Sequence, residues 1–74
     1  MDHQLARSAE LVSLSPRQTE VLALLGDGVL AKAISVRLGL SETTVRNHIH
    51  SILLRLGCHS QLEAVAVARR VHII

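Results

Sequence analysis

Hydrophobic residues recur every three to four positions in four segments of the chain, and start or stop signals bound each segment. This spacing predicts helices, and no stretch alternates between apolar and polar residues as an exposed strand would. We expect helices over about 16–25, 30–38, 42–56 and 61–70. The pattern therefore predicts an all-α fold.

Serine residues are expected to cap three of these helices. The caps are Ser15, Ser41 and Ser60, and two of them form capping boxes with Gln18 and Glu63, three residues later. Gly39 and Gly57 follow the second and third helices, where a left-handed residue commonly ends a helix. These signals predict short, well-defined connections between the helices.

The third predicted helix has two different faces. Its apolar residues fall within about 40° of one another at about 100° per residue, and we expect them in the core. They are Val45, Ile49, Ile52 and Leu56. The opposite face carries Thr43, Arg46, Asn47 and His50. All four can hydrogen-bond to base edges or phosphates. Because only residues 39–41 separate it from the shorter second helix, the layout is that of a helix-turn-helix motif.

Composition removes several classes of function. Hydrophobic residues make up 49% of the chain, yet it contains no Phe, Trp or Tyr. RNA-binding sheets and single-strand-binding barrels stack bases on aromatic rings, and an aromatic cage for a cationic ligand is built from the same rings, so these classes are excluded. A net charge of +2 permits a polyanionic partner without requiring one. The composition favours reading of paired DNA by hydrogen bonds.

The chain is the size of one small domain. Its 74 residues divide into an N-terminal segment, 1–13, and a domain, 14–74. The first segment is a tail, a linker or a short extra helix. No apolar run approaches the length of a membrane span, and the first ten residues do not resemble a secretory signal. The single cysteine fits a reducing compartment, so we expect a cytoplasmic protein.

Three blocks of sequence identify a family resemblance. They are LSPRQTEVLALL at 14–25, KAISVRLGLSETTVRNHIHSILLRLG at 32–57 and AVAVA at 64–68. Residues 14–68 thus resemble the DNA-binding domain of LuxR-type regulators, also called the NarL/FixJ or GerE type. The resemblance implies a four-helix fold, with a trihelical core and a C-terminal dimerisation helix. It also implies sequence-specific binding of double-stranded DNA in bacterial transcription, with residues 42–56 in the major groove.

The resemblance implies three sets of site residues. Base contacts are implied for Arg46, Asn47 and His50. Phosphate contacts are implied for Lys32, Thr43 and Thr44, and the helix start at Ser41 adds backbone N–H groups that favour an anion. Dimer contacts are expected at Leu62, Ala66 and Arg69. A homodimer would read an inverted repeat, and RNA polymerase and a fused N-terminal regulatory domain are further candidate partners.

Several positions depart from the usual family pattern. Leu30 and Ala31 replace a small polar pair, which removes one or two phosphate contacts. Gln61 replaces a frequent Arg, and Leu62 replaces a frequent Thr or Ser near the start of the fourth helix. Leu62 therefore adds to an apolar stripe that favours dimerisation. Leu54 is unusual because the wheel places it on the exposed side of the third helix.

No cofactor, metal site or enzymatic activity is expected. His48 and His50 point about 200° apart on a helix and cannot chelate one ion. Cys58 neighbours His59 but has no second cysteine, and we expect it to be a small buried hydrophobe. A helical chain of this size offers neither a substrate pocket nor a nucleophile elbow for hydrolysis.

Two other functions remain open alternatives. A sigma-factor-like helix-turn-helix domain would need an appended region that binds RNA polymerase. A helical protein-interaction module that has lost DNA binding is favoured by apolar positions at Val29, Leu30, Val36, Leu54 and Leu62. Within the favoured interpretation, the chain is either the output domain of a response regulator or a small stand-alone regulator.

Overall fold

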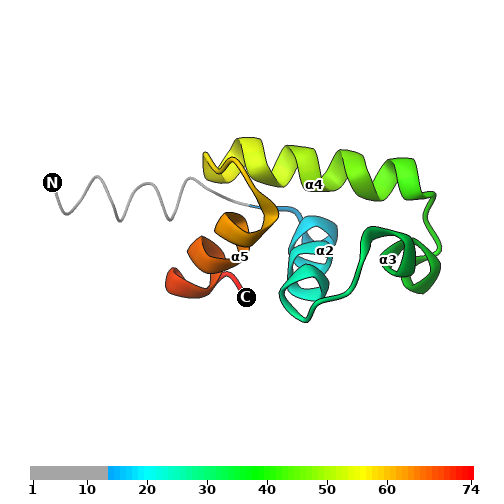
Figure 1. The fold of residues 1–74 in the computed structure, drawn as a ribbon, viewed down its shortest axis with the longest axis horizontal. Helices are drawn as coiled ribbons and strands as arrows, with labels where there is room; N and C mark the ends of the chain where they lie inside the picture. Colours follow the sequence, from blue (N-terminus) through cyan, green and yellow to red (C-terminus); the bar gives the residue numbers. More distant parts are fainter. Residues whose placement is uncertain (1–13) are drawn as a thin grey trace, which may run out of the picture.

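The computed structural model describes residues 14–74, so the alternatives for residues 1–13 lie outside the described part of the chain. It contains four helices and, within residues 14–74, no strand (Figure 1). The helices are α2 (Pro16–Gly26), α3 (Ala31–Leu38), α4 (Glu42–Leu56) and α5 (Gln61–Arg70). The all-α prediction is confirmed, and the predicted helix ends agree to within about one residue. None of the described helices is long and apolar enough to cross a membrane.

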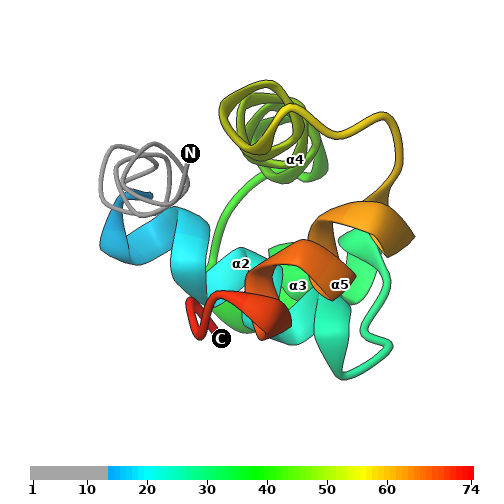
Figure 2. The same ribbon diagram turned by 90° about the vertical axis from the view of Figure 1, so that its left-hand side faces the viewer.

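The longest helix, α4, lies against all three of the others. Figure 2 views α4 nearly end-on, and the other helices gather on one side of it. The opposite side of α4 is left open along its length.

The second predicted helix begins one residue later than expected, because Leu30 is its extended N-cap residue.

The core consists of aliphatic side chains from all four helices. Its buried members are Val21, Leu22, Ile34, Val45, Ile49, Ile52, Ala64 and Ala68. Three of the four core residues predicted on α4 are therefore buried, while Leu56 is half-buried and packs against the edge of the core. The two alanines allow α5 to approach closely, so aliphatic residues fill this core without an aromatic ring.

The serine caps form as predicted, with one change in detail. The box at Ser15 is complete, since the Gln18 N–H donates to Ser15 Oγ and the Ser15 N–H donates to Gln18 Oε1, both at 3.0 Å. Ser60 Oγ accepts from the Glu63 N–H at 3.1 Å, but the Glu63 carboxylate accepts from the His59 N–H at 2.7 Å. The predicted second capping box is thus wrong by one residue. Ser60 has a φ of −148°, against −65° at Ser15, which turns its N–H away from the helix start.

All four helices end with a left-handed residue followed by a bond back into the last turn. The left-handed residues are Gly28, Gly39, Gly57 and His72. After Gly39, the Leu40 N–H donates to the Ser35 carbonyl at 3.0 Å. After His72, the Ile73 N–H donates to the Ala68 carbonyl at 2.8 Å. α5 therefore ends as the others do, but without a glycine.

Candidate nucleic-acid interface

The turn between α3 and α4 sets the direction of α4. Gly39 adopts a φ of 67° and ends α3, and Ser41 then begins α4 from an extended backbone. Ser41 Oγ accepts from the Thr44 N–H at 3.0 Å, and the Ser41 hydroxyl donates to Thr44 Oγ1 at 2.9 Å. These bonds fix the start of the helix that carries the candidate base-reading residues.

The candidate base-reading residues share the open side of α4. Arg46, Asn47 and His50 are all exposed. Val45 and Ile49, which lie between and beside them in the sequence, are buried on the other side of the helix. The helix therefore holds one face in the core while the other projects polar side chains outward, as a groove-reading helix requires.

A hollow of about 190 Å³ lies beside this face of α4 and brings in a residue from α5. Its lining includes Arg46, His50, Leu53 and Gln61. Gln61 is exposed at the start of α5. Sequence reasoning treated Gln61 only as the loss of a basic residue, whereas its amide lies at the edge of the candidate site. The sequence around residue 61 gives no signal that Gln61 lies beside Arg46 and His50, because this depends on how α5 packs on α4.

Arg46 is held by an acidic neighbour on its own helix. Its Nη2 atom donates to Glu42 Oε2 at 2.6 Å. The two side chains are 66% and 39% exposed, so the pair lies at the surface. No side-chain partner was predicted for Glu42, although a Glu four residues before an Arg is a known stabilising pair in helices. That spacing was the signal for this contact.

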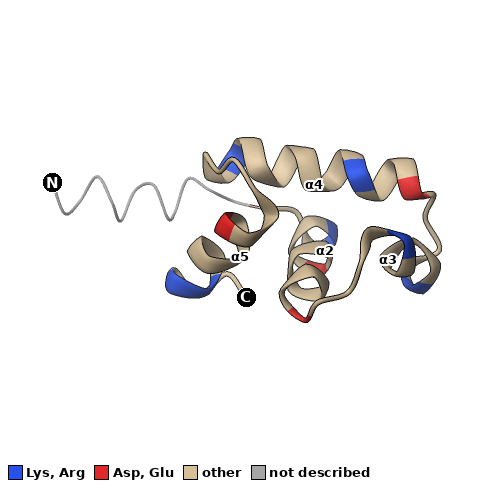
Figure 3. Cartoon of the chain, viewed as in Figure 1, with Lys and Arg blue, Asp and Glu red and all other residues tan. Residues whose placement is uncertain are grey.

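The candidate phosphate contacts lie on both helices of the motif. Lys32 is exposed in the first turn of α3, and among residues 14–74 it has no ion-pair partner. Thr43 is exposed, whereas Thr44 is half-buried and its N–H is already bonded to Ser41. Figure 3 shows that Lys and Arg outnumber acidic residues on α3 and α4. Thr43 and Lys32 are thus the more accessible of these candidates.

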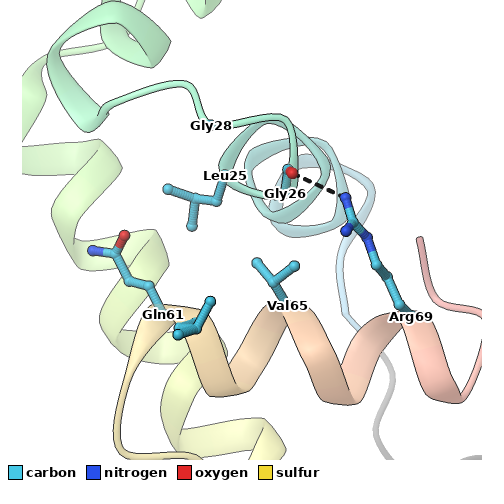
Figure 4. A pocket seen from close by; sticks show the side chains of 7 residues that line it. Leu25, Gly26, Gly28, Gln61, Val65 and Arg69 are labelled. Atoms are coloured by element: carbon cyan, nitrogen blue, oxygen red, sulfur yellow. Dashed lines mark hydrogen bonds between the residues drawn. The ribbon is translucent and has the colours of Figure 1, made fainter.

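The candidate dimer residues fall into two groups. Leu62 is 82% exposed and Ala66 is also exposed. Arg69, in contrast, reaches back to α2, where its Nη2 atom donates to the Gly26 carbonyl at 2.9 Å (Figure 4). A Cβ atom added to Gly26 would lie 3.2 Å from this nitrogen, so the two helices meet closely here. Arg69 therefore has a role within its own chain.

An open hollow of about 420 Å³ borders this contact between α5 and the end of α2. It is mostly apolar, and its lining includes Leu25, Leu62 and Val65, with Arg69 at one side. Figure 4 shows Val65 and Leu25 facing one another across it. The exposed Leu62 thus stands at the rim of an apolar depression.

Cys58 and the histidines do not assemble a metal site in the described part of the chain. Residues 14–74 contain no group of three or more potential ligands from His, Cys, Asp and Glu. Cys58 is half-buried, less than expected, because it follows the helix end at Gly57 and packs at the margin of the core. Burial raises the pKa of its thiol, and the Glu63 carboxylate raises it further. The thiolate needed for metal binding or oxidation is therefore disfavoured.

The apolar residues that favoured a protein-interaction module are not all at the surface. Leu30, Val36, Leu54 and Leu62 are exposed. Val29 instead packs against the core, because its N–H closes the end of α2 on the Leu24 carbonyl at 3.0 Å. The four exposed residues come from three separate helix regions.

Known proteins match this chain along most of its length. LnrK, a transcriptional regulatory protein of Bacillus subtilis (strain 168), is 34% identical over 68 residues, or 92% of this chain and 31% of LnrK. YdfI, also a transcriptional regulatory protein of that strain, is 38% identical over 82% of this chain and 29% of its own length. The transcriptional activator protein CarR of Pectobacterium carotovorum subsp. carotovorum is 38% identical over 81% of this chain and 25% of its own length.

The chain spans less than a third of the length of these relatives. No solved structure matches it significantly. Residues 12–68 match the family described as bacterial regulatory proteins, luxR family (GerE), whose helix-turn-helix domains bind DNA. This match includes α2, the helix-turn-helix of α3 and α4, and most of α5. The chain therefore belongs to the luxR family of bacterial regulatory proteins.

Proposed function

We propose that this domain recognises a specific sequence in double-stranded DNA by placing α4 in the major groove. One observation carries the proposal: Arg46, Asn47 and His50 project from a helix whose other face is held by the core. A helix so held presents its polar groups in one fixed arrangement. That arrangement is suited to reading a pattern of donors and acceptors on base edges.

Each proposed base contact has its own chemistry. The Arg46 guanidinium can donate two hydrogen bonds to guanine O6 and N7, and the Asn47 amide can pair with adenine N6 and N7. His50 lies one turn after Arg46 and offers an imidazole nitrogen to the next bases. A well-formed bidentate contact contributes about 1–3 kcal/mol of discrimination.

Phosphate contacts would set the position of α4 on the duplex without reading sequence. We assign them to Lys32, Thr43, Thr44 and the helix start at Ser41. The first N–H groups of a helix have no partner within the helix and favour an anion. Since the Thr44 N–H is bonded to Ser41, the earlier N–H groups of α4 and the Thr44 hydroxyl are the available donors.

Pairing of two domains would supply affinity that one domain lacks. The exposed Leu62 and Ala66 on α5 are the proposed centre of a homodimer contact, with Arg69 at its edge. Two domains related by a two-fold axis would read an inverted repeat with half-sites about one helical turn apart. The modest net charge of +2 supports this, because a small domain with few cations binds DNA weakly alone.

The wider role follows from the family. DNA-binding regulators of this family are not enzymes, and we propose that the domain directs transcription in the cytoplasm, where the bacterial chromosome lies. It would serve as the output domain of a response regulator or as a small stand-alone regulator. RNA polymerase and an N-terminal regulatory domain are then its proposed further partners.

Selection of binding sites from random duplex DNA tests this function. We expect the wild-type chain to enrich an inverted repeat, and Arg46→Ala to bind the enriched site with about 1–3 kcal/mol less free energy and to lose preference at one base pair. Far-UV circular dichroism should confirm that the variant is folded. No enrichment by the wild type, or unchanged specificity of the variant, would contradict the proposal.

A further inference from the structure

The contact between Glu42 and Arg46 lies on the proposed DNA-reading face. The Glu is one turn N-terminal to the Arg, which is the more favourable order for such a pair in a helix. Arg46 Nη2 and Glu42 Oε2 are 2.6 Å apart, and both side chains are open to solvent. The guanidinium that we assign to base reading is therefore already oriented before any DNA is bound.

The charge at Glu42 works against general attraction to DNA. In residues 31–56, the helix-turn-helix segment, it is the one acidic residue beside four basic residues. It is also the first residue of α4, between Ser41 and Thr43, where the free N–H groups would receive a phosphate. A carboxylate in this position repels the DNA backbone, so its placement lowers affinity that is independent of sequence.

The same carboxylate is compatible with base reading. A guanidinium has five N–H donors in a planar fork, and the bond to Glu42 uses one of the two hydrogens on Nη2. The remaining donors can still bind guanine O6 and N7. Contact between Arg46 and a phosphate, however, would bring that phosphate close to the Glu42 carboxylate or break the pair. Glu42 therefore penalises backbone contacts of Arg46 more than base contacts.

We propose that Glu42 is a positioning residue that directs Arg46 toward base edges and suppresses binding to DNA of unrelated sequence. This inference rests on the proposed function of the domain. The carboxylate lowers the affinity of the domain for all DNA, but it lowers the affinity least for the site where Arg46 contacts its base. The ratio of specific to non-specific affinity therefore rises.

The test compares Glu42→Gln with the wild type on two duplexes of equal length, the selected site and a scrambled version, over a range of salt concentrations. We expect the variant to bind the scrambled duplex about 3–10-fold more tightly, with a salt slope steeper by up to about one unit. The ratio of the two affinities should fall. Glu42→Asp, which keeps the charge, should recover much of the ratio.

Two controls separate this mechanism from simpler ones. Glu20→Gln changes the net charge equally and removes the exposed pair between Arg17 and Glu20 on α2, 3.2 Å apart, so it should leave the ratio unchanged. In an Arg46→Ala background, Glu42→Gln should no longer alter the ratio. A role of Glu42 limited to stabilising the start of α4 would change binding to both duplexes equally.

The outcomes are distinct. If the wild type does not prefer the selected site, the proposed function fails. If the wild type is selective but Glu42→Gln keeps its affinity ratio, the inference about Glu42 fails alone. An equal fall in the Glu20→Gln variant, or an effect that persists without Arg46, would also overturn it.

Discussion

The end of α5 offers a direct test of how this small domain is stabilised. His72 has a φ of 61°, in the left-handed region, while the equivalent positions after the other three helices are glycines. The conformation costs a residue with a Cβ atom about 1–2 kcal/mol. The exposed His72 side chain makes no hydrogen bond or ion pair in the described structure that would offset this cost. We predict that His72→Gly stabilises the domain.

The magnitude follows from two opposing effects. Removal of the left-handed strain gains about 1–2 kcal/mol, and the greater freedom of glycine in the unfolded chain costs about 0.5–1 kcal/mol. With the midpoint of each range, the net gain is about 0.75 kcal/mol, or a rise of about 3–6 °C in Tm for a domain of this size. The substitution should stabilise the whole domain and not only the end of α5, because Ile73 and Ile74 pack against the core immediately after His72.

Thermal unfolding followed by far-UV circular dichroism measures this effect. Protein concentration must be the same in every sample, because dimerisation makes Tm depend on it. His72→Ala is the matched control, since it removes the imidazole but keeps the Cβ atom and should not stabilise. Gly39→Ala, at a φ of 67°, should lower Tm. A His72→Gly variant that melts at or below the wild type, or an equal gain from His72→Ala, would refute the reasoning.

Three further predictions each test a different surface of the domain. Lys32→Ala should weaken binding to all duplexes similarly and reduce the salt slope by about one unit, and a sequence-dependent loss in binding titrations would contradict a phosphate role. Leu62→Glu should shift the chain toward monomer in sedimentation while Tm, measured at a concentration where the wild type is monomeric, stays the same; an unaltered dimer would refute the α5 contact. Arg69→Ala should cost about 0.5–1.5 kcal/mol of stability by removing the bond to the Gly26 carbonyl, and an unchanged Tm would show that this bond contributes nothing.

The helices were predictable because their signals are local. Ser15, Ser41 and Ser60 each accept the N–H bond expected of a cap, and the apolar spacing on α4 located its three buried residues. Each of these signals is read from residues three or four positions apart in the sequence. The same locality made the contact between Glu42 and Arg46 readable from their spacing.

Other features depend on information that local patterns do not contain. The bond from Arg69 to the Gly26 carbonyl joins positions 43 residues apart and requires the packing of α5 on α2. The left-handed end at His72 had no glycine to mark it. Gln61 comes near the reading face only because the loop after Gly57 brings the start of α5 to the side of α4. The surfaces of α5 were thus harder to predict than the helix itself.

The position of α4 links DNA reading to stability, and this decides which variants can identify a DNA contact. Its buried face contributes Val45, Ile49 and Ile52 to the core. A change of Ile52 to Ala should cost about 2–5 kcal/mol, against a total of about 4–11 kcal/mol for a domain of this length. Loss of binding in such a variant therefore reports unfolding as readily as a lost contact. Arg46 and Asn47 are exposed on the same helix, so their replacement leaves the core intact and a change in binding can be assigned to the DNA interface.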